Sequence, residues 1–391
     1  MNRNFNLENN ISDNSNSYNP LSQTINQTNL PNSNVELEDN SVVKLDNTIQ
    51  EIIIDSNSNL STEQNYDLSD IEKFVDIDND EPCFVAVHIG AGYHSASKTG
   101  SYRTLCEQTC SNVIELLKQG CNARTACATA VALLENSPLT NAGLGSNLTL
   151  NEKVECDASI MDREGFGSVG SLSNVKNPIM VSLSLLEAQS KGTLSMGRIV
   201  PCMLVGDGAR MWARENNIEE VDDDSLKTDA MIKTHNHYKH KLERVNELLV
   251  NQQQQQQQES TTIKKTLFDT NEIKLLGEDN PLDTVGAIVI DRSGHMASAV
   301  SSGGILLKHP GRVGHASMFG CGCWVEEDIQ FVEDKQYENH SIAICTTGCG
   351  EYIIKTLFAK ECCNYICRHR DKLGYNLNEF FKKKFFSKLN F

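Results

Sequence analysis

The sequence predicts a folded domain of mixed α and β structure that follows a long polar segment. A β-branched run at 84–89 predicts a buried strand, and apolar residues at helical spacing predict helices over 102–119 and 123–134. Two further strands are indicated on either side of the turn residues 291–294. Helices and strands mixed in this way must pack as layers around a common core.

The remaining elements are predicted in order along the chain. Residues 1–81 are rich in Asn and Ser with few aromatics, so we expect a disordered tail ahead of a domain spanning 82–391. Residues 217–281 contain a polar helix candidate (227–249) and a glutamine tract (252–258), which indicates a flexible insert. The other expected strands are 154–161, 202–205 and 341–344, and the other expected helices are 178–189, 209–215 and 352–361.

Composition excludes several classes of protein. A formal net charge of −17 and a pI near 5.0 disfavour a nucleic-acid partner, whose phosphates require a basic face. The sequence contains no run of about 18 apolar residues, so no membrane span is expected. Its first residues show no secretory signal pattern. Fourteen cysteines in such a chain indicate reduced thiols and a cytoplasmic or nuclear location. Their spacing matches no metal site, so neither a metal nor a cofactor is expected.

A hairpin directs attention to Thr284, at the start of the strand that follows the insert. If Asp291 pairs with Gly294 across the turn, Thr284 lies opposite Ser301 and beside Ser302. A register slip of one residue would still leave one of these serines close. The local sequence therefore predicts a cluster of hydroxyl groups around Thr284.

A threonine at this position could act as a nucleophile. If the Asp283–Thr284 bond is cut, Thr284 carries both a hydroxyl nucleophile and an α-amino group. This amine titrates near pH 7.7–8.0, so a substantial fraction of it is neutral under cell conditions. A strained turn that presses the hydroxyl onto the Asp283 carbonyl can cleave the bond by proximity. The sequence therefore favours a hydrolase that matures by cutting its own backbone.

Two glycine-containing loops supply further candidate groups. Arg312 lies in the run 308–314, where a guanidinium suits capture of a carboxylate. Thr347 and Gly348 lie between a predicted strand and helix, where backbone N–H groups can hold an oxyanion. Each feature also has an ordinary interpretation, as a strand residue, a solvated charge or a helix cap. His88 and His309 receive no functional role.

Taken together, these motifs resemble the plant-type (type 2) asparaginase family of N-terminal-nucleophile hydrolases. The resemblance covers about residues 83–361, and several motifs occur in the family's order. Three segments, given separately below, resemble the threonine aspartase (taspase) branch specifically. The motifs are Leu282–Ala287, Ser301–Gly304, Pro310–Gly314, Thr347–Glu351, Asn141–Ser146 and Asp157–Asp162, and those of the aspartase branch are Gly90–Ser95, Lys308–Gly314 and Gly320–Trp324.

The resemblance implies an α+β fold, specifically a four-layer αββα sandwich cut into an α subunit (82–283) and a β subunit (284–391). Such an αβ heterodimer can pair again. Thr284 would be nucleophile and base, and Ser302 would support it. Arg312 would hold an aspartate carboxylate of a protein substrate, and Thr347 with Gly348 would form the oxyanion hole.

Three functions remain open at this point. The first is a threonine endopeptidase that cuts itself between Asp283 and Thr284 and then cuts proteins after aspartate. The second is an isoaspartyl peptidase/L-asparaginase; the residue His315 argues against it, because asparaginases carry there an aspartate that binds a free α-amine. The third is a shortened, non-catalytic relative, because only 40 residues follow Glu351 and a sheet edge would be exposed.

Overall fold

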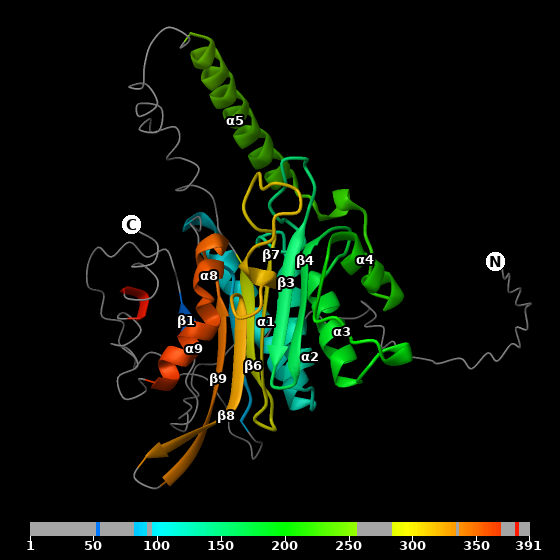
Figure 1. Ribbon diagram of the computed structural model, residues 1–391, viewed down its shortest axis with the longest axis vertical. Coiled ribbons are helices and arrows are strands. Elements are labelled where there is room, and N and C mark those ends of the chain that lie inside the picture. Colours follow the sequence, from blue (N-terminus) through cyan, green and yellow to red (C-terminus); the bar gives the residue numbers. More distant parts are fainter. Residues whose placement is uncertain are drawn as a thin grey trace, which may run out of the picture.

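The computed structural model describes residues 52–54, 82–91, 96–255, 284–333, 336–368 and 380–382. Two β-sheets pack face to face and helices cover both outer faces (Figure 1). The strands are β1 Ile52–Ile54, β2 Phe84–His88, β3 Cys156–Asp162, β4 Gly165–Leu172, β5 Met203–Val205, β6 Val285–Ile290, β7 Met296–Ser302, β8 Cys323–Glu333 and β9 Gln336–Thr346. The principal helices are α1 Thr99–Lys118, α2 Ala123–Glu135, α3 Pro178–Ser190, α4 Gly206–Glu215, α5 Asp229–Gln255, α8 Gly350–Thr356 and α9 Phe358–Arg368.

The layers run helix, sheet, sheet, helix, which confirms the expected α+β sandwich. One sheet has the order β2-β6-β7-β3-β4-β5 and the other the order β1-β9-β8. Helices α1 to α4 pack on the first sheet, and α8 and α9 lie over the second. Three apolar clusters separate the layers: one under α1 to α3, one between the sheets, and one under α9. Because β6 lies between β2 and β7, Thr284 begins a central strand.

The hairpin register differs by one residue from the sequence prediction. Val285 pairs with Ser301, so Thr284 lies opposite Ser302 rather than Ser301. The cause is the turn: the Asp291 carbonyl accepts from Gly294 N–H, but Asp291 N–H donates to the His295 carbonyl. Gly294 has φ +79°, so it adds a residue to the loop.

Strand β4 was not predicted, because glycines weaken a strand pattern. Here the glycine has a packing role: a Cβ on Gly167 would lie 2.0 Å from the Ser182 carbonyl oxygen of α3. The helix therefore rests directly on the strand backbone. The expected helix over 352–361 is likewise two helices, since Leu357 adopts a left-handed conformation with φ +49°.

Two segments expected to lie outside the core contribute to the structure. Ile52–Ile54 of the predicted disordered tail forms β1 along β9, at the sheet edge that was expected to be open. Leu226 and His235 of the predicted flexible insert are buried, and His235 Nε2 lies 3.0 Å from the Thr149 carbonyl oxygen. The rest of the tail and residues 256–283 of the insert lie outside the described residues.

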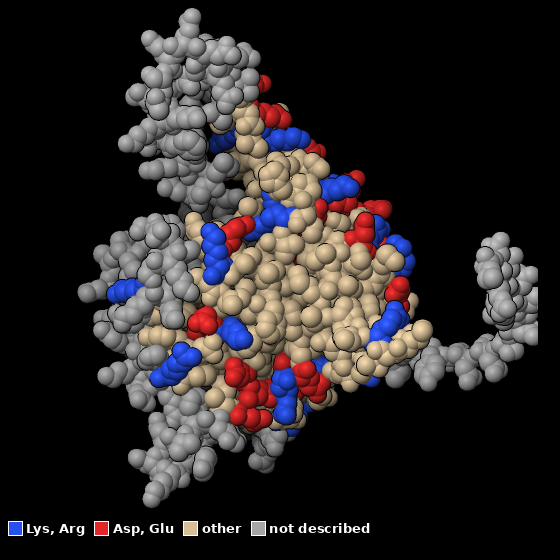
Figure 2. Space-filling view, viewed as in Figure 1, with Lys and Arg blue, Asp and Glu red and all other residues tan. Residues whose placement is uncertain are grey.

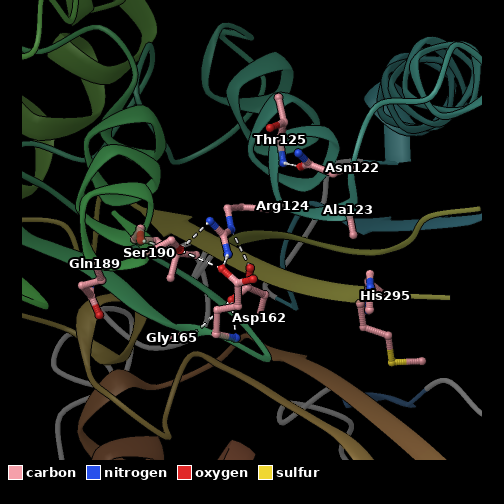
Figure 3. Close-up of polar contacts among 12 residues, drawn as sticks. Asn122, Ala123, Arg124, Thr125, Asp162, Gly165, Gln189, Ser190 and His295 are labelled. Carbon is pink, nitrogen blue, oxygen red and sulfur yellow. Dashed lines mark hydrogen bonds and ion pairs between the residues drawn. The ribbon is translucent and has the colours of Figure 1, made fainter. Parts of the chain in front are cut away.

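Away from Thr284, charged side chains tie the layers together. Arg124 near the start of α2 donates Nε to Asp162 (2.5 Å), Nη2 to Glu164 (2.6 Å) and Nη1 to Ser190 of α3 (3.0 Å). Figure 3 shows the guanidinium directed at Asp162 and Ser190, with the Asn122 cap of α2 beside it. A helix, a strand turn and a second helix are thus joined by one side chain.

The surface shows no concentration of positive charge in the view of Figure 2. Lys and Arg alternate with Asp and Glu around the rim of this face, and its centre is largely uncharged. The fourteen cysteines all lie in the described part of the chain, and none of them forms a disulfide. Among the described helices, none has the length and hydropathy needed to cross a membrane.

Candidate active site

Thr284 lies at the start of β6 and is buried, with 3% of its surface exposed. Thr284 lines a small pocket that is partly open to solvent. The pocket is lined by Asn141, Thr284, Ser302, Gly304, Ile305, Arg312, Gly314, His315, Ala316, Gly348 and Gly350. A hydroxyl group, a guanidinium and an imidazole therefore meet around one small space.

The structure brings together most of the residues that the sequence singled out. Thr284, Ser302, Arg312 and Gly348 all line the pocket. Thr347 is buried at 5% exposure next to Gly348 but does not line it. Asp283 lies outside the described residues.

Glycines shape the mouth of the pocket where the hairpin ends. A Cβ on Gly303 would lie 2.4 Å from Asn141 Oδ1, so no other residue fits between the hairpin and the Asn141 loop. Asn141 Nδ2 donates to the Gly304 carbonyl (2.8 Å), and Gly304 N–H donates to Ser302 Oγ (3.0 Å). Ser302 is thereby held in place opposite Thr284.

The guanidinium of Arg312 is held on one edge and open on the other. Its Nε and Nη2 donate to Glu351 Oε1 at 2.9 and 2.7 Å. Its Nη1 lies between Gly304 and Gly314, where an added Cβ would come within 2.9 and 2.8 Å. Both glycines line the pocket, so this edge of the cation is available to a bound anion.

Residues that sequence reasoning missed fix the loop that carries Arg312. The Gly311 and Gly314 N–H groups donate to Glu155 Oε2 (2.8 Å) and Asp157 Oδ2 (2.6 Å). The two carboxylates bracket Arg312 and come from neighbouring positions of one predicted strand. Carboxylates two residues apart point to the same side of a strand, so the sequence spacing could have predicted that these two act together.

Lys308 is a second missed residue. It is buried at 2% exposure, and its Nζ donates to the backbone carbonyls of Glu155 and Gly303 (2.8 Å to Gly303). Burial is the main cause that lowers its pKa, and the nearby Asp157 carboxylate opposes that shift. Lys308 therefore ties the Arg312 loop to the hairpin end, rather than acting as a solvated cation.

Two buried histidines flank Thr284. His315 Nε2 lies 3.5 Å from Thr284 Oγ1 and 3.2 Å from the Thr346 carbonyl oxygen. Burial, aided by the Arg312 charge, lowers its pKa to about 4. His88 of β2 lies over Gly286, where a Cβ would be 2.2 Å from Nε2, and burial with the nearby His315 lowers its pKa to about 4. Both rings are therefore neutral near pH 7.

A third buried titratable group lies behind the site. Glu135 at the end of α2 is fully buried and accepts from Ile179 N–H (3.0 Å) and Asn177 Nδ2 (3.1 Å). Burial raises its pKa to about 8, although hydrogen bonds from Ser301, Asn177 and Ile179 oppose that shift. In the described parts of the chain, no three His, Cys, Asp or Glu side chains group as metal ligands.

Comparison with known proteins agrees with this architecture. A family model described as asparaginase matches residues 81–385. The chain is 28% identical to an isoaspartyl peptidase of Escherichia coli (strain K12), over 71% of this chain and 74% of the relative. It is 31% identical to a putative isoaspartyl peptidase/L-asparaginase of Dictyostelium discoideum, over 70% and 76%. The chain therefore belongs to the asparaginase family of N-terminal-nucleophile hydrolases.

Proposed function

We propose that this chain is a threonine hydrolase that cuts its own backbone between Asp283 and Thr284. The observation that carries the proposal is the position of Thr284: a buried threonine directly precedes the internal strand β6, lines the pocket and has its hydroxyl 3.5 Å from the ring of His315. After cleavage its α-amino group would lie on the same residue as the hydroxyl and would accept the hydroxyl proton.

The other residues receive roles that their positions support. Ser302, opposite Thr284, would hydrogen-bond the nucleophile. The open edge of Arg312 would bind a substrate carboxylate, in a charge-assisted contact. Thr347 and Gly348 would donate hydrogen bonds to the oxyanion; Gly348 has φ +138°, a conformation available to glycine, so its peptide can turn toward the pocket.

The two halves of a cut chain have a clear reason to stay together. Strand β6, which would belong to the new β subunit, pairs with β2 over Phe84–His88 and lies against α2 of the α subunit. Strand β7 likewise pairs with β3 from Asp157 to Asp162. Cleavage therefore would leave an αβ heterodimer with an unbroken sheet. Its pairing into larger assemblies and a cytoplasmic or nuclear location stay predictions.

For the substrate, the proposal is an endopeptidase that cleaves proteins after aspartate, as in the threonine aspartase branch. The support is that none of the described residues that line the pocket carries a carboxylate, and the neutral His315 faces Thr284. A substrate residue with a free α-ammonium group would find no charge partner among these lining residues. A mid-chain aspartate needs none, and its side chain can reach the open edge of Arg312.

The second candidate is an isoaspartyl peptidase/L-asparaginase. It is favoured by the names of the relatives, which include an isoaspartyl peptidase/L-asparaginase of Homo sapiens with 31% identity over 63% of this chain. This candidate shares the nucleophile and the Arg312 contact with the first. The two differ in whether the substrate carries a free α-amine. They also differ in whether the attacked carbonyl is the side-chain carbonyl or the α-carbonyl of the aspartyl residue.

A pair of substrates separates the two candidates. The cleaved protein is incubated with a peptide that contains an internal aspartate and has an acetylated N-terminus, and separately with an isoaspartyl dipeptide. The endopeptidase proposal expects hydrolysis of the acetylated peptide after aspartate. Turnover of the dipeptide alone would establish the second candidate and contradict the first.

A further inference from the structure

The side chain of His315 contacts the hydroxyl of the proposed nucleophile. It begins a short 3₁₀ turn, His315–Ser317, and is buried at 3% exposure. Its Nε2 lies 3.5 Å from Thr284 Oγ1, at the long end of hydrogen-bond distances. Catalytic hydrogen bonds are often long before substrate binds and shorten in the complex. The contact is therefore suited to a role in the reaction.

The surroundings of the ring fix which nitrogen carries the proton. Nε2 also lies 3.2 Å from the Thr346 carbonyl oxygen. A carbonyl oxygen only accepts hydrogen bonds, so a bare Nε2 would face it with two lone pairs opposed. The proton therefore belongs on Nε2, and this nitrogen donates rather than accepts. His315 then cannot remove the proton of Thr284 through Nε2.

The ring is also held in its neutral form. Burial lowers the pKa of His315 to about 4, and the Arg312 charge adds to that effect. The Thr346 carbonyl opposes the shift without reversing it. Near pH 7, one neutral tautomer thus faces Thr284, and His315 adds no positive charge beside Arg312.

We propose that His315 is a positioning residue whose single Nε2–H is shared between the Thr346 carbonyl oxygen and the hydroxyl oxygen of Thr284, and so donates to both. This rests on the proposed function, because it concerns how Thr284 acts as nucleophile. With one lone pair of Oγ1 engaged by His315, the hydroxyl proton is directed toward the α-amino group. As Oγ1 attacks the substrate carbonyl carbon, its proton passes to that amine, and His315 keeps its own proton throughout.

Three substitutions test this role. His315→Gln places an N–H at nearly the same reach as Nε2, His315→Asn places one nearer the backbone, and His315→Leu removes the donor while filling similar space. For acetylated aspartyl peptide, the leucine variant is expected to lose about tenfold to a hundredfold in kcat with little change in KM, because binding by Arg312 is retained. The glutamine variant is expected to recover to within a few-fold of wild type, and the asparagine variant is not.

A spectroscopic measurement checks the tautomer without relying on activity. Nitrogen-15 histidine spectra of Thr284→Ala, assigned by loss of one ring signal in Thr284→Ala/His315→Gln, should show a neutral ring protonated at Nε2 between pH 6 and 8. A ring protonated at Nδ1 would overturn the inference. A leucine variant as active as wild type would also overturn the inference. The same holds if the glutamine and leucine variants are equally impaired although both unfold at the wild-type temperature.

The same experiment keeps the two proposals apart. A wild-type chain that is folded but never cut at Thr284 would remove the proposed function and the inference with it. A wild-type chain that is cut and active, together with an unimpaired leucine variant, would remove only the role of His315.

Discussion

Buried polar groups are paired to different extents at the two ends of strands β3, β6 and β7. At one end, the carboxylate of Asp162 is paired with Arg124, and Asp291 accepts from the Ala123, Ser293 and His295 N–H groups. At the other end, Thr284 faces neutral histidines, and Arg312 is paired along only one edge. The same sheet thus carries a fully paired end and an end with unused capacity.

The difference separates stability from function. Paired charges and satisfied carboxylates hold helices to the sheet, and their loss leaves a buried charge without a partner. At the Thr284 end, burial keeps His88, His315 and Glu135 uncharged near neutral pH. The two histidines lower stability as the pH falls below about 6.5, and Glu135 lowers it as the pH rises from about 4.5 toward 8. Uncharged groups also leave hydrogen-bonding capacity for a substrate. Local departures of this kind are expected at functional sites.

The largest expected effect is on activity at the Thr284 end. Among the described residues that line the pocket, Arg312 is the only lysine or arginine, and Arg312→Ala removes its charge. We expect kcat/KM for an aspartyl peptide to fall about a hundredfold or more, since loss of a charge-paired contact costs roughly 2–5 kcal/mol. The free energy of unfolding should change by at most about 1 kcal/mol, because the Glu351 partner is half exposed. Unchanged kcat/KM would show that Arg312 does not bind substrate.

The next effect concerns pH. Because His88 and His315 have pKa values lowered to about 4, the unfolded chain binds protons first as the pH falls below about 6.5. Their contribution to stability is complete above pH 6.5 and is lost as the pH falls toward 4, on the order of 3 kcal/mol for each group.

Urea unfolding of Thr284→Ala between pH 7 and pH 4 measures this loss. The double variant Thr284→Ala/His315→Gln should lose distinctly less stability over the same range, because one of the two groups no longer titrates. Equal losses in the two proteins would mean that His315 is protonated in the folded chain.

A smaller effect is expected at the paired end. Arg124→Ala leaves Asp162, whose side chain is 9% exposed, without its cation. We expect the free energy of unfolding to fall by about 2–3 kcal/mol, somewhat below the cost of breaking a fully buried pair. Self-cleavage and kcat/KM should stay at wild-type values, because the cluster lies at the opposite end of the strands.

A matched control comes from α1. Arg103 pairs with Glu107 at 2.8 Å, but both side chains are exposed, at 79% and 61%. Arg103→Ala should therefore change stability by no more than about 0.5 kcal/mol. If Arg124→Ala were equally mild, or if it reduced activity, the division between the two ends would be wrong.

The sequence predicted the parts of this structure that depend on short-range pattern. The strand at 84–89, the helix that begins at Ala123 and the hairpin around residue 292 all follow from periodicity and turn residues. The hairpin register was wrong by one residue, because the left-handed conformation of Gly294 is set by the turn type rather than by the residue pattern. Strand β4 was missed because Gly167 is required by contact with α3, a tertiary constraint.

The sequence also predicted part of the candidate site, but not all of it. Thr284, Ser302, Arg312 and Gly348 lie together as expected. The contact between His315 and Thr284 was not foreseen, since the two residues meet only through the packing of β6 against the turn that follows the Arg312 loop. The same holds for the burial of Lys308, which looks like a surface cation in the sequence.

The most direct test of the account is whether the chain cuts itself. Purified wild-type protein, Thr284→Ser and Thr284→Ala are compared by intact mass and N-terminal sequencing, with circular dichroism to show that each is folded. We predict that wild type and the serine variant yield a fragment that begins at residue 284, and that the alanine variant stays a single chain of 43.4 kDa. A folded wild-type protein that remains uncut would contradict the account and favour a non-catalytic relative.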